Sequence, residues 1–109
     1  MKRIEAIIRP TRVANVCAAL KSAEHHRIVI SQVENRGDSD GTPYQLRGKT
    51  YKAGLLINTK VEVIVQDKEA DRIIESIRDA AFTGKTGDGE IYVYDMNDVI
   101  RIGTGGAAT

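Results

Sequence analysis

A chain of 109 residues has room for one domain of ordinary size and not for two. Its 16 basic and 15 acidic residues nearly balance, so the sequence lacks the strong positive charge that is typical of nucleic-acid-binding proteins. No apolar run reaches the roughly 20 residues that span a bilayer, and the start of the chain is unlike a signal peptide. The single Cys17 cannot close an intrachain disulfide. We therefore expect a cytoplasmic protein.

Hydrophobic periodicity divides the chain into six regular elements. In the predicted strands apolar residues alternate, as Ile4 and Ala6 do, and in the predicted helices they form a stripe, as Ile73 and Ile77 do. In chain order, the predicted elements are a strand at 2–9, a helix at 11–24, strands at 27–34 and 59–66, a helix at 68–82 and a strand at 90–95. This βαββαβ order predicts a ferredoxin-like α+β fold, in which an antiparallel four-stranded sheet carries both helices on one face.

Residues at the ends of these elements predict where each one stops. We expect Asp67 to be the N-cap of the second helix and Gly84 to be its C-terminal cap. His25 and His26 follow the first helix, and we expect them to cap its C-terminal end. The end of the chain is predicted as a helical turn at 96–100, an extended segment at 101–104 and a frayed tail at 105–109.

A long segment between the second and third predicted strands shows little periodicity. It runs from about residue 35 to residue 58 and contains four glycines and Pro43. A loop of this length inside a small domain is usually functional or mobile. The predicted fold also leaves one face of the sheet without helices, and that face would need a partner, a ligand or another subunit.

The glycine-rich stretch from Thr83 to Gly89 is the most informative local motif. Glycine allows positive φ and a close approach of the backbone, and a row of backbone N–H groups suits a phosphate. Gly84-Lys85-Thr86 does not end a P-loop, because that motif needs a glycine where the chain has Asp79, and it must open a helix instead of following one. The residues alone leave two interpretations open, a helix cap with a turn or a backbone anion site.

No catalytic or metal-binding constellation stands out in the sequence. The only cysteine, Cys17, falls on the apolar stripe of the first helix, where we expect a buried and inert thiol. Metal motifs such as His-Glu-x-x-His or paired Cys-x-x-Cys are missing. We therefore expect a non-enzymatic protein with no resident cofactor or metal. A small hydrolase is the alternative from another class, and it would need a nucleophile or base that the sequence does not offer.

Taken together, several segments resemble the PII signal-transduction family, from Lys2 to about Thr104. They are the opening Met-Lys-Arg-Ile-Glu-Ala-Ile-Ile-Arg-Pro, Arg47-Gly48-x-x-Tyr51, Lys60 to Val65, Ala81-x-Thr83-Gly84-Lys85-x-Gly87-Asp88-Gly89 followed by Ile91, and Ile100-Arg101-Ile102-x-Thr104-Gly105. The resemblance implies one PII-like domain over residues 1–109, with a mobile T-loop at about 36–58 and a short tail at 105–109. It also implies a homotrimer, an adenine nucleotide in each cleft between subunits, and a T-loop that changes shape with the ligand and binds a membrane transporter or a metabolic enzyme.

The resemblance also assigns site residues. The nucleotide-binding residues that it implies are Ile7, Val29, Gly37, Glu62, Val63, Ile64, Thr86, Gly87, Asp88, Gly89 and Arg101. For the T-loop it implies Arg47 and Tyr51 as partner-binding residues. Some family members are uridylylated at the position of Tyr51, but here its neighbours are basic, so we expect no such modification.

Four departures from the family pattern change the charge of the implied site. Ser39 replaces a glutamine that helps hold magnesium and 2-oxoglutarate, Asn58 and Glu90 replace lysines, and Gly103 replaces an arginine. Three cationic contacts are therefore lost, each typically worth about 1.5–3 kcal/mol, and a carboxylate has entered. We expect AMP or ADP to bind in preference to Mg-ATP, with no response to 2-oxoglutarate.

The target of such a regulator is less constrained by the sequence. By analogy with family variants that have a degraded oxo-acid site, we expect a role in inorganic-carbon uptake. This role implies bicarbonate as a second ligand and a location at the membrane periphery, through binding to a transporter. The alternative is a nitrogen-regulatory PII protein that controls an ammonium transporter through Arg47 and still senses ATP and ADP.

Overall fold

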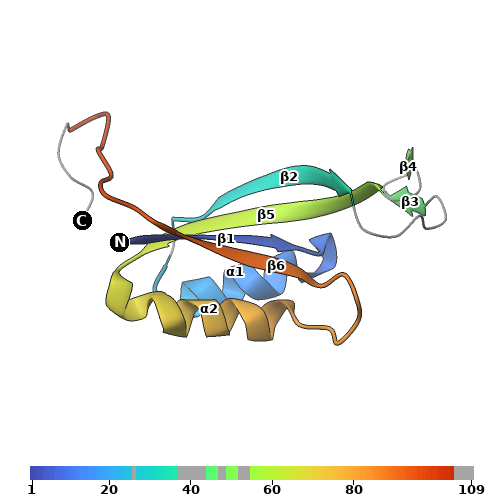
Figure 1. Ribbon diagram of the computed structural model, residues 1–109, viewed down its shortest axis with the longest axis horizontal. Helices are drawn as coiled ribbons and strands as arrows, with labels where there is room; N and C mark the ends of the chain where they lie inside the picture. The colour runs from blue at the N-terminus through green and yellow to red at the C-terminus, as the bar shows by residue number, and fades with distance from the viewer. Residues whose placement is uncertain (26, 37–43, 47–48, 52–54, 105–109) are drawn as a thin grey trace.

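A four-stranded antiparallel sheet with two helices on one face forms the body of the molecule (Figure 1). The computed structural model describes residues 1–25, 27–36, 44–46, 49–51 and 55–104. The elements are β1 (Lys2–Ile8), the 3-10 helix η1 (Pro10–Arg12), α1 (Val13–Ser22), β2 (Val29–Arg36), β3 (Tyr44–Leu46), β4 (Lys49–Tyr51), β5 (Leu55–Val65), α2 (Asp67–Ala81) and β6 (Gly89–Asp95). The sheet order is β2-β5-β1-β6, which confirms the ferredoxin-like α+β prediction.

Cross-strand register decides which side chains face the helices. Ile4 of β1 lies opposite Val63 of β5 and Val93 of β6, so these three side chains share one face. Their neighbours, such as Glu5 and Glu62, point to the other face, which neither helix covers. We call this second surface the open face.

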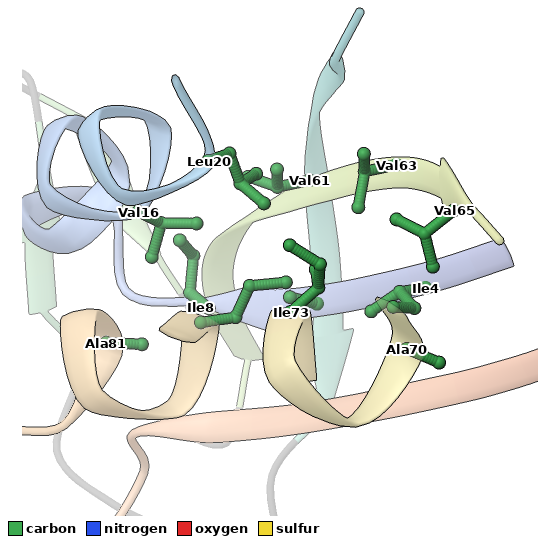
Figure 2. Close-up of a cluster of buried hydrophobic side chains, with 12 residues drawn as sticks. Ile4, Ile8, Val16, Leu20, Val61, Val63, Val65, Ala70, Ile73 and Ala81 are labelled. Atoms are coloured by element: carbon green, nitrogen blue, oxygen red, sulfur yellow. The ribbon is translucent and has the colours of Figure 1, made fainter. Parts of the chain in front are cut away.

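The hydrophobic core fills the space between the sheet and the two helices (Figure 2). It is wholly aliphatic, which follows from an aromatic content of 5% and the lack of tryptophan. The buried residues are Ile4, Ala6, Ile8, Val61, Val63 and Val65 from the sheet, Val16 and Leu20 from α1, and Ala70, Ile73, Ile77 and Ala81 from α2. The alternating and helical patterns of the sequence thus correspond to the observed buried faces.

The segment predicted to be irregular from 35 to 58 is partly regular. β2 continues to Arg36 and β5 begins at Leu55, and the two strands stay paired to these residues. β3 and β4 form a further small hairpin within the same segment. Cross-strand pairing therefore continues where the sequence itself shows little alternation.

Both predicted caps of α2 are wrong by one or two residues. The N-cap is Gln66, and Asp67 is already helical; its carboxylate pairs with the N-terminal ammonium group of Met1 at 2.9 Å. The C-cap is Phe82 in an extended conformation, and Gly84 follows two residues later with φ +83°. Gly84 therefore serves the loop and not the helix end.

The predicted capping role of His25 holds for its backbone and not for its side chain. The His25 amide donates to the Leu20 carbonyl at the end of α1 at 2.9 Å, whereas its Nε2 lies 3.3 Å from Oε2 of Glu69, so the side chain bridges to α2. The other expected cap, His26, lies outside the described residues. Within the described part of the chain, no helix is long and apolar enough to cross a bilayer.

The chain after β6 differs from the prediction as well. Residues 96–100 form no helical turn, and residues 102–104 form a turn where an extended segment was expected. The Asp98 carboxylate accepts a hydrogen bond from the Val99 amide at 2.8 Å, and Met96 donates from its amide to the Met1 carbonyl at 3.1 Å. Local side-chain bonding of this kind competes with helix formation. The tail at 105–109 is outside the described residues.

Candidate functional site

The segment from Thr83 to Gly89, which we call the glycine loop, joins α2 to β6 and is organised around the carboxylate of Asp88. That carboxylate accepts hydrogen bonds from the Thr83 amide at 2.8 Å, from the Gly84 amide at 3.1 Å and from the Thr83 hydroxyl. The Thr83 hydroxyl oxygen in turn accepts from the Lys85 amide at 3.2 Å. The first half of the loop is thus held by its own side chains, and the Asp88 carboxylate points inward and not toward a ligand.

Arg9 supplies a second layer of contacts, and sequence reasoning missed it. Its Nε lies 2.9 Å from Oδ1 of Asp88, and its Nη2 donates to the carbonyl oxygen of Thr86 at 2.7 Å. The strand register, and not the predicted topology, carries the signal for this contact. Ile8 pairs with Gly89, so the next residue of the first strand must lie beside residue 88.

These contacts hold the pKa of Asp88 well below its ordinary value of 3.8. The hydrogen bond from the Thr83 hydroxyl is the largest cause, followed by the Thr83 amide and by Arg9. Each of them stabilises the ionised carboxylate. The carboxylate therefore stays charged at any physiological pH and keeps the loop closed on itself.

A pH-dependent contribution to stability follows from this shift. Because the folded-state pKa of Asp88 is lower than the unfolded value of 3.8, the ionised carboxylate stabilises the fold above that pH, and the contribution is lost as the pH falls below it. We expect wild type to exceed Asp88→Asn in free energy of unfolding by a constant margin above about pH 5, and the two curves to converge at lower pH. Urea titrations from pH 2 to 7 measure the margin, and a margin that stays constant down to pH 2 would contradict the assignment.

Three consecutive amides of the glycine loop are free to bind an anion. The N–H groups of Thr86, Gly87 and Asp88 donate no hydrogen bond to any residue that the structure describes. Gly87 has φ +93° and Gly89 has φ +113°, conformations that L side chains rarely adopt. Successive amides in such a turn form a concave site suited to a phosphate oxygen.

A second group of predicted residues lines a cavity of about 610 Å³. The side chains of Val29 and Ile64 are 60% and 40% exposed, and Arg101 contributes a cation. Apolar surface beside the guanidinium groups of Arg27 and Arg101 and the carboxylate of Glu62 suits a flat heteroaromatic ring carrying few negative charges. Val63 belongs to the same cavity, but its side chain is buried in the core, so it can offer mainly backbone. The predicted residues in this cavity are Val29, Glu62, Val63, Ile64 and Arg101.

The glycine loop and this cavity do not meet within one chain. The loop leads into β6 at one edge of the sheet, and Val29 begins β2 at the opposite edge. β1 and β5 lie between these edges, so the edges are about 14 Å apart. Ile7 of β1 pairs with Glu90, so it belongs with the glycine loop and not with the cavity. The predicted nucleotide residues therefore form two separate half-sites.

The remaining predicted positions fall in different places. Gly37, Arg47 and Ser39 lie outside the described residues. Tyr51 is the last residue of β4, and Asn58 pairs with Val33 in the sheet. Two further positions affect the charge of the site. Glu90 places a carboxylate beside the glycine loop, and this carboxylate accepts a hydrogen bond from the Tyr92 hydroxyl. Gly103 has no side chain, and a β-carbon there would meet nothing within 4 Å.

The expectation of a buried thiol is wrong. Cys17 is only partly buried, because it lies at the margin of the α1 stripe between the fully buried Val16 and Leu20. Among the described residues, no three histidine, cysteine, aspartate or glutamate side chains gather as a metal ion would require.

Comparison with known proteins adds an independent finding. A family model described as "Nitrogen regulatory protein P-II" matches residues 1–106. The chain is 40% identical over 105 residues to nitrogen regulatory protein P-II 2 of Methanothermobacter thermautotrophicus, with 96% of this chain and 91% of that protein covered. It is 41% identical over 105 residues to nitrogen regulatory protein P-II of Rhizobium meliloti, with 96% and 94% covered.

Proposed function

Because the chain belongs to the P-II family of regulatory proteins, we propose that it is a non-enzymatic sensor which binds AMP or ADP in clefts between the subunits of a homotrimer. The ligand state is passed to a partner protein through the T-loop at about residues 36–58. The observation that carries this proposal is the division of the predicted nucleotide residues into two half-sites at opposite edges of one sheet.

Assembly of identical copies would unite the two half-sites. When the β6 edge of one copy meets the β2 edge of the next, the free amides of the glycine loop approach the apolar cavity around Val29 and Ile64. The open face supports assembly too, because it exposes large apolar and aromatic side chains in the isolated chain. These side chains are Val29, Ile64, Tyr92 and Tyr94, each 39–60% exposed.

The charges near the half-sites support a ligand with few phosphates. Arg27 and Arg101 are cations at the cavity and Glu62 is an anion there, which leaves a small net positive charge, whereas Asp88 and Arg9 neutralise each other inside the glycine loop. Glu90 places a carboxylate directly after the loop, and Gly103 offers no side-chain donor. Three amides suit a single phosphate group, and the carboxylate would repel the outer phosphates of ATP.

Calorimetry with the three adenine nucleotides tests the proposal. We expect the protein to bind AMP and ADP more tightly than Mg-ATP, with no effect of 2-oxoglutarate, and light scattering to give the mass of a trimer. Equal indifference to all three nucleotides, or a monomeric mass at working concentration, would refute the sensor. Tight Mg-ATP binding that 2-oxoglutarate strengthens would refute the nucleotide preference alone.

We further propose that the regulated partner is a membrane transporter for inorganic carbon, with bicarbonate as a second ligand. This rests on the departures at Ser39 and Asn58, which remove groups that the family uses for an oxo-acid. Bicarbonate should then tighten ADP binding in the same calorimetric titration, and an unchanged affinity would count against it.

The alternative function is control of an ammonium transporter, with sensing of ATP and ADP. The relatives are named for nitrogen regulation, which is compatible with this alternative. It predicts recovery of an ammonium transporter when the tagged protein is captured from its own membranes, and loss of that recovery in Arg47→Ala. Capture of a carbon transporter under the same conditions would reject it.

A further inference from the structure

The turn that follows β1 holds both ends of the glycine loop. Arg12 donates from Nε and Nη2 to the carbonyl oxygen of Ala80, at 3.0 and 2.7 Å, which fixes the last turn of α2 just before the loop. Arg9 contacts Asp88 and the Thr86 carbonyl on the far side. The turn is itself rigid, because Pro10 restricts its backbone and the Arg12 amide donates to the Arg9 carbonyl at 3.0 Å.

We propose that Arg9 is a positioning residue that sets the three free amides of the glycine loop for one phosphate group. This inference rests on the proposed function, and it deepens it by naming the group that fixes the anion site. Arg9 binds the carbonyl of Thr86, and the peptide plane after that carbonyl carries the Gly87 amide. The orientation of the Thr86 carbonyl therefore fixes the direction of the Gly87 N–H.

The fork geometry of the guanidinium explains why arginine is needed here. Nε reaches a carboxylate and Nη2 reaches a carbonyl, and these two acceptors belong to residues on either side of Gly87. A β-carbon at Gly87 would lie 3.5 Å from Nη2, so the guanidinium packs directly beneath this part of the loop. Lysine keeps the charge, but its single ammonium group cannot reproduce this planar two-point contact.

Arg9 is not itself a free phosphate ligand. Its Nε and Nη2 already donate hydrogen bonds to Asp88 and to the Thr86 carbonyl, and its positive charge is balanced by the Asp88 carboxylate. The ionised state of Asp88, whose pKa is lowered mainly by Thr83, keeps that pairing intact. Arg9 therefore acts through the backbone of the loop, as a group that supports a binding element without touching the ligand.

Arg9→Lys with a graded set of ligands tests the proposal. Because the substitution disturbs the amides and not the base-binding cavity, we expect AMP and ADP each to bind about tenfold more weakly, while adenosine is unaffected. Arg72→Lys is the matched control, since Arg72 is an exposed arginine whose ion pair to Glu69 lies on α2 away from the loop. It should change none of the three affinities.

The alternatives give different patterns. A direct phosphate contact would make the loss larger for ADP than for AMP, and a merely structural role would weaken adenosine as well. Either result would overturn the proposal, as would an Arg9→Lys protein that binds all ligands like wild type.

A measurement without nucleotide separates this inference from the proposed function. Inorganic phosphate titrated into labelled wild type should shift the amide resonances of Thr86, Gly87 and Asp88, and Arg9→Lys should reduce that response about tenfold. If wild type ignores adenylates but shows this response, the nucleotide function fails and the positioning role stands. If these amides do not respond to phosphate in wild type, the positioning role fails.

Discussion

Gly89→Ala is expected to destabilise the protein by more than about 4 kcal/mol and to remove adenylate binding. A β-carbon at this position would lie 1.8 Å from the carbonyl oxygen of Ile7 and 2.9 Å from its carbonyl carbon. Both atoms belong to the backbone of β1 at the centre of the sheet, so no side-chain rotation can relieve the clash. The φ of +113° adds strain for any residue other than glycine. The junction between the glycine loop and β6 must therefore separate from β1.

Two other glycines provide the controls for this effect. Gly87→Ala meets only the flexible end of Arg9 at 3.5 Å, so it should cost about 1–2 kcal/mol for its positive φ of +93°. Gly103→Ala meets nothing within 4 Å and should be nearly neutral. Urea unfolding of the three variants gives the comparison. A midpoint for Gly89→Ala that equals the midpoint for Gly87→Ala would show that β1 can move aside at little cost.

Glu90→Lys is expected to raise the affinity for Mg-ATP by about tenfold to a hundredfold, because it replaces a repelling carboxylate with a charge-assisted donor. Glu90 directly follows the glycine loop, and the bond that it accepts from the Tyr92 hydroxyl keeps its carboxylate close to the β6 edge. AMP should respond much less, since it lacks the outer phosphates. The preference between nucleotides should therefore reverse.

Two variants separate the causes of this reversal. Glu90→Gln removes the repulsion without adding a cation, and it should give part of the gain. Tyr92→Phe removes only the hydroxyl that contacts Glu90, and it controls for the lost hydrogen bond. If Glu90→Lys leaves Mg-ATP binding unchanged in calorimetry, residue 90 does not face the outer phosphates, and the account of the nucleotide preference fails.

Most of the fold could be predicted because its pattern is local. Ile4, Ala6 and Ile8 alternate, and Ile73 and Ile77 recur at helical spacing, and each set is buried as its period requires. The ends were predicted less well. Gln66 and not Asp67 caps α2, because the Asp67 carboxylate bonds to an ammonium group 66 residues earlier in the chain. Such distant partners leave no local signal.

In the candidate site, too, local features could be predicted from the sequence and distant contacts could not. The glycines of the loop were visible in the sequence, because positive φ selects them residue by residue. The contacts of Arg9 join residues 77 and 79 positions apart, and they become predictable only after strand register is known. The extension of β5 to Leu55 was missed because the sequence there shows no clear alternation, and the strand is recognised only through its pairing with β2.

The extension of β2 and β5 beyond the body of the molecule has a mechanical consequence. β1 stops pairing with β5 at Thr59, whereas β2 and β5 continue through four more pairs, from Val33 with Asn58 to Arg36 with Leu55. This two-stranded arm is about 13 Å long, and the small β3–β4 hairpin lies beyond its far end (Figure 1). Paired ribbons without a third strand twist more readily than wider sheets. A rotation of a few degrees where the arm leaves the sheet would therefore displace the β3–β4 hairpin further than the residues at the base of the arm.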